Sequence, residues 1–216
     1  LTSRNDWSST LGEENRSYMY NSASVSAIVN SFIDPEQTLF NLLKIRAGYA
    51  QVGNDTDPYQ LSQTFDVPGQ GYFGLTTLSA PSIKLNPDLK PEQVTSVEFG
   101  IEGSMLGNRL NFDISVYDKE TTDMIFNVPV AAATGYQFFK ENVGKVSNKG
   151  VEITIGGRLI QNSKMVWDTS LNYAKNENEL LSLIDDLETF TYMTTNSGNL
   201  SLRAQVGGTI GDIYGT

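Results

Sequence analysis

Long runs of strict alternation between apolar and polar residues are the feature that most constrains this chain. Apolar side chains occupy every second position on both sides of a turn at 106–108, at Val97, Phe99, Ile101, Leu110, Phe112, Ile114 and Val116. A second run brackets a turn at 161–164, with Val151, Ile153, Ile155, Leu159, Met165, Trp167, Leu171 and Tyr173 on one face. A period of two predicts two β-hairpins whose strands have one apolar and one polar face.

The length of these strands separates two kinds of β-protein. Strands in soluble folds are usually about five or six residues long. Roughly ten residues at about 3.3 Å each, tilted by about 40°, rise about 25 Å, which is the height of the apolar band of a membrane barrel. We therefore expect an all-β chain that forms part of an antiparallel transmembrane β-barrel, with the apolar faces toward lipid and the polar faces toward the lumen.

Short and long connections alternate along the chain. Besides the two hairpins, strands are expected at 18–29, 39–52 and 204–214, which makes about seven strands in all. The long segments between them fall on one rim of the predicted barrel, at 53–93, 121–149 and 176–202. Loops longer than about 12 to 15 residues are uncommon in compact domains, so this rim is the predicted functional face.

Composition excludes several classes of protein and of site. The chain has no cysteine and no histidine, which excludes disulfide scaffolds, thiolate metal sites and a Ser-His-Asp triad. Its net charge of −10 repels phosphates, so we expect no nucleic-acid partner. The chain has no run of about 18 apolar residues, so no membrane helix is predicted. Nothing fixes two carboxylates at the separation found in glycosidases, so no enzyme is predicted.

Six short blocks carry a family resemblance. They are Arg4–Leu11 (RNDWSSTL), Lys44–Thr56 (KIRAGYAQVGNDT), Leu85–Glu92 (LNPDLKPE), Tyr117–Asp123 (YDKETTD), Asn142–Glu152 (NVGKVSNKGVE) and Gly211–Gly215 (GDIYG). Their sequence and order resemble those of the SusC/RagA-type TonB-dependent outer-membrane transporters, across nearly the whole chain.

The resemblance implies a larger protein. Members of this family enclose a plug in a barrel of about 22 strands. Residues 1–216 are therefore expected to be an internal part of the C-terminal β-barrel domain, with the plug and the remaining strands supplied by other parts of a longer polypeptide. The implied function is import of a bulky nutrient, typically an oligosaccharide and in some members a peptide. A SusD-like surface lipoprotein would capture it, and the TonB complex would act through the plug. No cofactor, metal or covalent chemistry is implied.

Aromatic residues in the long loops are the candidate substrate-binding residues. Aromatic rings stack on sugar faces and fill peptide pockets, although they also form the cores of ordered loops. The candidates are Tyr59, Phe65, Tyr72 and Phe73 in the first loop, Tyr136, Phe138 and Phe139 in the second, and Phe190 and Tyr192 in the third.

Two further loop segments are assigned structural roles. The oxygen-rich run Asn54–Asp57 lacks the glycine and glutamate of a calcium-binding EF-hand loop, so it is predicted to be a solvated turn. Residues 180–187 are predicted to form a short helix-like stretch. Leu180, Leu183, Ile184 and Leu187 would share one face of it and pack the loop.

The alternative function comes from another class of protein. A secreted β-sandwich that binds glycans, or an adhesin, would use the same aromatic residues without transporting anything. Its apolar strand faces would meet each other in a shared core instead of facing lipid. Lipid-facing and core-facing rows look alike in sequence, so the family resemblance decides between the two.

Overall fold

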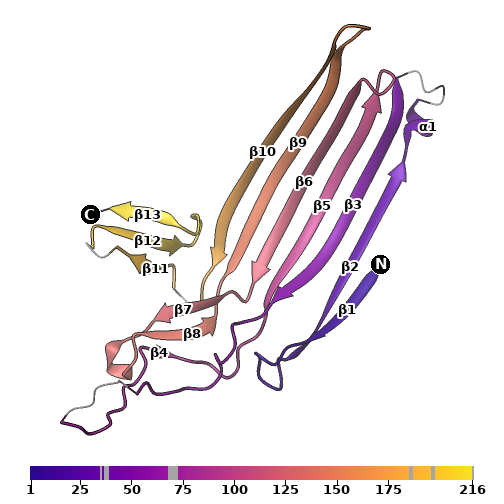
Figure 1. The fold of residues 1–216 in the computed structure, drawn as a ribbon. Coiled ribbons are helices and arrows are strands. Elements are labelled where there is room, and N and C mark those ends of the chain that lie inside the picture. The colour runs from indigo at the N-terminus through magenta and orange to yellow at the C-terminus, as the bar shows by residue number, and fades with distance from the viewer. Residues whose placement is uncertain (35, 37–38, 68–72, 185–186, 196–197, 216) are drawn as a thin grey trace.

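Seven strands form one antiparallel sheet in the computed structural model (Figure 1), which describes residues 1–34, 36, 39–67, 73–184, 187–195 and 198–215. The order of strands in the sheet is β1-β2-β3-β5-β6-β9-β10. Their bounds are β1 Thr2–Trp7, β2 Ser17–Ile28, β3 Phe40–Asn54, β5 Glu92–Met105, β6 Leu110–Thr122, β9 Lys145–Gln161 and β10 Val166–Ser182. Sequence neighbours in this sheet are also spatial neighbours, as in the wall of an up-and-down barrel.

The connections between these strands are sorted by length. The link through α1 (Asn30–Ile33) and the β5–β6 and β9–β10 turns lie at one end of the sheet, and the long connections lie at the other end, which we call the rim (Figure 1). The predicted alternation of short and long loops is therefore confirmed. Among the described residues, no helix has the length and apolar character needed to cross a membrane.

The apolar positions line up across the strands on one face. Ile114 pairs with Ile101 on β5 and with Ile153 on β9, as the alternation predicts. Leu159 departs from the prediction, because a β-bulge pairs Trp167 with Ile160 and Asp168 with Arg158. Phe99 and Leu171 on this face are 57% and 65% exposed, so the described chain does not bury them. A sandwich core would require the opposite.

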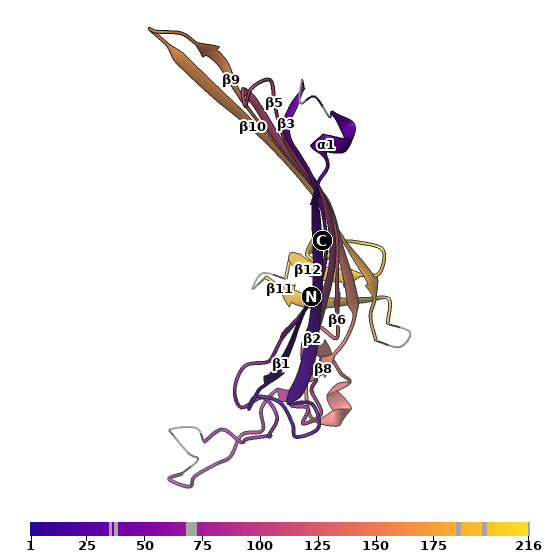
Figure 2. The same ribbon diagram turned by 90° about the vertical axis from the view of Figure 1, so that its right-hand side faces the viewer.

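Two small sheets lie at the rim end. One has the order β4-β8-β7, and the other has the order β11-β12-β13. Their bounds are β4 Ile83–Lys84, β7 Ile125–Pro129, β8 Phe138–Asn142, β11 Thr189–Thr194, β12 Leu200–Gln205 and β13 Asp212–Gly215, and a 3₁₀ turn, Ala132–Thr134, precedes β8. Figure 2 shows the long strands nearly edge-on as a single layer.

Two predicted elements are wrong. The strand expected at 204–214 is interrupted, because Gly207 and Gly211 adopt left-handed φ angles of 80° and 105° between β12 and β13. The seventh strand of the main sheet is β1 instead. The helix-like stretch predicted from residue 180 is also absent at its start, since β10 continues to Ser182 and Leu180 pairs with Val146.

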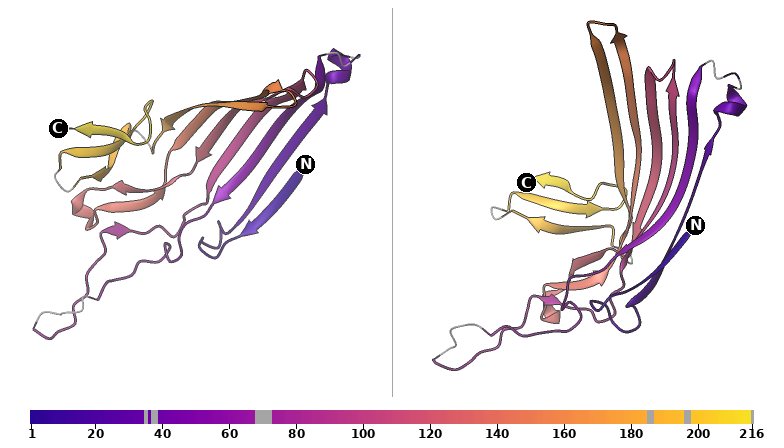
Figure 3. Two further views of the ribbon diagram at one scale, coloured as in Figure 1. Left: turned by 45° about the horizontal axis from the view of Figure 1, so that its top comes forward. Right: turned by 45° about the vertical axis from the view of Figure 1, so that its right-hand side comes forward.

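A small apolar core attaches the β11–β13 sheet to the main sheet. Val146 of β9, Leu180 of β10 and Ala204 of β12 are buried together. Partly buried side chains surround them, namely Met124, Phe126, Leu183, Leu187 and Ile210. Figure 3 shows the β11–β13 sheet projecting from the rim end of β10. We call the two small sheets, β4-β8-β7 and β11-β12-β13, together with this core, the rim lobe.

Candidate functional site

The face of the main sheet opposite the apolar rows is polar, and its residues form rows across five strands. From the tight-turn end toward the rim, the rows are Lys44-Glu102-Asp113-Thr154-Asn172, Arg46-Gly100-Ser115-Glu152-Ala174, Gly48-Glu98-Tyr117-Gly150-Asn176, Ala50-Ser96-Lys119-Asn148-Asn178 and Val52-Val94-Thr121-Val146-Leu180. Charge therefore gathers near the tight turns, amides lie farther along, and the last row enters the rim core.

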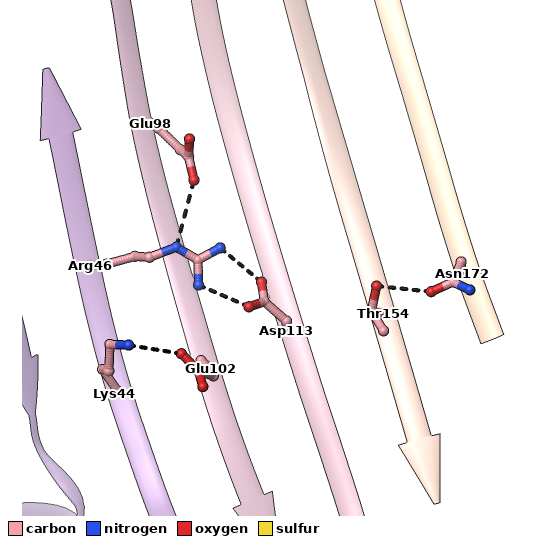
Figure 4. Close-up of polar contacts among 7 residues, drawn as sticks. All are labelled: Lys44, Arg46, Glu98, Glu102, Asp113, Thr154 and Asn172. Carbon is pink, nitrogen blue, oxygen red and sulfur yellow. Dashed lines mark hydrogen bonds and ion pairs between the residues drawn. The ribbon is translucent and has the colours of Figure 1, made fainter. Parts of the chain in front are cut away.

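Opposite charges are paired across strands in the first rows (Figure 4). The Arg46 guanidinium donates to Asp113 Oδ1 and Oδ2 over 2.8 and 3.0 Å, a two-point contact of the kind that fixes geometry best. Its Nε lies 3.6 Å from Glu98, and Lys44 Nζ donates to Glu102 over 3.0 Å. These pairs link β3, β5 and β6 through side chains as well as through the backbone.

A glycine makes room for the contact between Arg46 and Asp113, which lie two strands apart. Arg46 on β3 must cross β5 to reach Asp113 on β6, and it does so directly over Gly100. A Cβ atom at Gly100 would lie 2.5 Å from Arg46 Cζ and Nε. At Gly48, on the same face, a Cβ would meet nothing within 4 Å. Gly100 is therefore needed for space, whereas Gly48 is not.

The same device recurs two strands away. Tyr117 on β6 crosses Gly150 on β9, where a Cβ would lie 2.4 Å from the tyrosine hydroxyl oxygen. The hydroxyl then donates to Asn176 Oδ1 on β10 over 3.1 Å. The ring of Tyr117 thus lies on the polar face of the sheet, whereas the predicted aromatic contacts were all in loops.

The predicted aromatics of the second loop lie in and beside β8. Phe138 lines a cavity of about 440 Å³ together with Ser82, Ile83, Ile125, Phe126, Asn127 and Lys140. Phe139 is its neighbour in the strand, and the Lys84 ammonium lies 5.2 Å from the centroid of its ring. Tyr136 is half-buried in the turn before β8. Among the candidates whose side chains are described, Phe138 thus lies beside a cavity.

The other predicted aromatics are more dispersed. Tyr59 and Phe73 are 93% and 87% exposed, and Phe65 is 59% exposed. Tyr72 lies outside the described residues. Phe190 and Tyr192 belong to β11, where Phe190 pairs with Ala204. The six candidates whose side chains are described are therefore not gathered into one site, and contact of the nine residues with a ligand stays a prediction.

The oxygen-rich run after β3 ties two rim connections together. Ser8 Oγ donates to Asp55, and Thr10 Oγ1 donates to the same carboxylate oxygen over 3.2 Å. The hydrogen bond from Ser8, assisted by Thr10, holds the pKa of Asp55 below its usual value. Asn54 Nδ2 donates to Glu92 over 3.0 Å. These exposed oxygens serve as structural acceptors that join the β1–β2 connection to the end of β3.

Sequence reasoning placed Arg46, Glu98, Asp113 and Tyr117 in strands without pairing them. Arg46 and Asp113 are 67 positions apart, and their contact depends on the register of three strands. One signal was available: an arginine, a glycine and an aspartate sit on the polar faces of three successive strands. A long side chain needs such a glycine to pass over the middle strand.

Comparison with known proteins gives consistent matches. The family model of the TonB-dependent receptor-like β-barrel matches residues 1–213. TonB-dependent receptor P39 of Formosa agariphila is 35% identical over 81% of this chain and 16% of its own length. TonB-dependent receptor SusC of Bacteroides thetaiotaomicron is 27% identical over 85% of this chain and 19% of its own.

Solved structures agree with these sequence matches. The RagAB peptide importer in its closed-closed state superposes with a TM-score of 0.82 at 26% identity, covering 95% of this chain and 22% of the other. The open-open state gives a TM-score of 0.79. The chain thus spans between 16% and 22% of the length of these relatives.

Proposed function

The chain belongs to the TonB-dependent receptor-like β-barrel family, and from this premise we propose that it forms part of the wall of a nutrient importer. The resemblance to SusC/RagA-type transporters is confirmed, and with it the location in the outer membrane of a Gram-negative bacterium. Proteins of this family are receptors and transporters, so the proposed work of the chain is binding and passage, without covalent chemistry on the substrate.

The extent of the barrel is part of the proposal. Residues 1–216 would be one portion of a C-terminal β-barrel domain that also encloses a plug. The relatives are about five times longer, since the chain covers 22% of the RagAB component it matches. Within the described residues, β1 and β10 are the outer strands of the main sheet, and each leaves one row of backbone groups without a partner strand. Further strands would satisfy both edges.

The observation that carries the proposal is the contrast between the two faces of the main sheet. One face exposes rows of isoleucine, valine, leucine and phenylalanine, and the other holds paired charges and amides. Only a wall between lipid and a polar interior suits both faces at once. The long connections gather at one end of that wall, where a bulky solute would first meet it (Figure 1).

The proposed solute is an oligosaccharide, with a peptide as the second candidate. SusC is a TonB-dependent receptor, and RagAB is named as a peptide importer. By analogy with both, a SusD-like lipoprotein would close over the rim, and the TonB complex would act through the plug. The loop aromatics, Phe138 above all, would contact the solute at the rim.

Three measurements test this function, two on the intact polypeptide and one on cells that lack it. Cell fractionation followed by gel electrophoresis with and without heating should give an outer-membrane band whose mobility shifts on heating, as folded barrels do. Purification through a tag should retain a surface lipoprotein. A strain lacking the polypeptide should lose growth on one class of oligosaccharide or peptide and keep growth on monosaccharides. A soluble protein without a mobility shift would count against the barrel and favour the glycan-binding sandwich.

A further inference from the structure

A group of amide side chains lies on the polar face immediately next to the rim core. This amide patch consists of Asn148, Asn176 and Asn178, together with Tyr117, whose hydroxyl contacts Asn176. Asn148 and Asn178 pair directly across strands, in the row that adjoins Val146 and Leu180. The backbone N–H of Ile210, in the rim lobe, donates to Asn178 Oδ1 over 3.2 Å. The patch therefore occupies the corner between the sheet and the lobe.

Hydrogen bonds within the patch fix the orientation of its amides. Asn148 Oδ1 accepts from Asn178 Nδ2 over 2.9 Å and from Asn176 Nδ2 over 3.4 Å. The Tyr117 hydroxyl donates to Asn176 Oδ1 from across Gly150. With its oxygen occupied twice, Asn148 directs an NH₂ group away, and among the described residues that group has no acceptor. Two N–H donors are thus held in place on the half-buried side chain of Asn148.

The charges around the patch favour a ligand rich in acceptors. Lys119 belongs to the same row as Asn148, and its ammonium lies 4.8 Å from the centroid of the Tyr117 ring. No ion pair to Lys119 occurs within the described part of the chain. The carboxylate of the neighbouring row, Glu98, lies beside Arg46. The patch therefore offers N–H and ammonium donors around one aromatic ring.

We propose that the amide patch is a contact site for a hydroxyl-rich, neutral oligosaccharide on the polar face beneath the rim lobe, an assignment that rests on the proposed function. Hydroxyl and ring oxygens of a sugar accept from Asn148, Asn176 and Lys119. The ring of Tyr117 offers an apolar surface beside them, as aromatic side chains do in ligand sites. Peptides are more often recognised at a strand edge or through pockets for their side chains. The donors of the patch are side chains on the face of the sheet, and further strands of the barrel would pair the edge of β10.

The test uses the intact polypeptide, purified in detergent together with any lipoprotein that accompanies it. The probes are a mixture of neutral hexasaccharides from cellulose, xylan, mannan and starch, and a random octapeptide library. In the double variant Asn148→Ala/Asn176→Ala, hexasaccharide affinity should fall about tenfold or more, since two hydrogen-bonding side chains are lost. The matched control is Asn172→Ala, on the same face of β10 but outside the patch, and its affinity should stay within about twofold.

A second variant covers the case in which the double variant does not fold. Asn148→Asp keeps the size and the accepting oxygen but removes both donors, and it should lower hexasaccharide affinity by a similar factor. A heat-shifted gel band confirms that each variant is folded.

Each remaining outcome decides one question. Hexasaccharide binding that is unchanged in Asn148→Asp overturns the patch and leaves the importer standing. Binding of octapeptides alone overturns the oligosaccharide assignment and leaves a peptide importer. If neither probe binds, and cells lacking the polypeptide take up both probes normally, the patch and the proposed function fail together.

Discussion

On one face of the main sheet Leu171 is 65% exposed, whereas on the other face Arg46 and Asp113 hold each other through two hydrogen bonds. No described element covers the apolar rows around Leu171 and Phe99 (Figure 2). On the polar face, Lys44 and Arg46 are paired with carboxylates of the neighbouring strands β5 and β6. Both faces are built on the same backbone ladder, so the difference lies entirely in the side chains.

This contrast shows what each face requires from its surroundings. Apolar rows without a covering layer are stable only against an apolar medium, because about 25 cal/mol is lost for each Å² of such surface left in water. Paired charges tolerate water, since exposed pairs lose little when they are hydrated. The apolar face therefore depends on lipid, and the polar face can border a water-filled lumen.

The largest expected effect comes from a charge on the apolar face. In the intact polypeptide, Leu171→Lys should destabilise the folded barrel by about 2 to 4 kcal/mol, the cost of a lysine near the middle of the bilayer. Its matched control is Ser170→Lys, the adjacent residue of β10, which is exposed and points to the polar face. The measurement is the fraction of heat-modifiable barrel in lipid vesicles across a urea series. Equal losses in both variants would contradict the assigned facing.

A smaller effect should follow from filling space on the polar face. Gly100→Val places a side chain where Arg46 crosses β5, and we expect a loss of about 1 to 3 kcal/mol from the displaced arginine. Gly48→Val has open space on the same face and should be neutral or slightly stabilising, because valine favours strands. The urea midpoints of the two variants give the comparison.

The double variant Gly100→Val/Arg46→Ala tests whether the loss in Gly100→Val comes from the displaced arginine. With the arginine removed, Gly100→Val should cost much less than it does alone, so the two effects should not add. Additive losses would mean that Gly100 serves the backbone of β5 and not the passage of Arg46.

The apolar face was predictable from the sequence, because a period of two is a local signal and survives without any knowledge of partners. Ile101, Ile114 and Ile153 were placed on one face, and the register confirms them. The polar contacts were not predictable in the same way. They depend on which residues of separate strands come into register, and the Arg46–Asp113 pair spans 67 positions.

The rim was the least predictable region, and the reasons are particular. Leu180 fits a helical spacing with Leu183 and Leu187, yet its pairing with Val146 extends β10 and buries it in the rim core. β1 was not predicted, because Thr2–Trp7 is mostly polar and shows no apolar alternation. It is a strand because its backbone pairs with β2. Loop aromatics such as Phe138 could be named, but the cavity beside Phe138 is lined by residues of three strands, whose pairing the sequence does not show.

The smallest expected effect comes from removing one charge of the polar face. Asp113→Asn should cost about 1 kcal/mol or less, because the side chains of Arg46 and Asp113 are 28% and 42% exposed in this chain. The difference from wild type should shrink further in about 1 M salt, where the screening length is about 3 Å. A loss of about 3 to 5 kcal/mol, insensitive to salt, is the penalty of an unpaired buried charge. That result would mean that another part of the intact protein covers the rows of Arg46 and Asp113, and the polar face would then be an interior surface and not a wall bordering water.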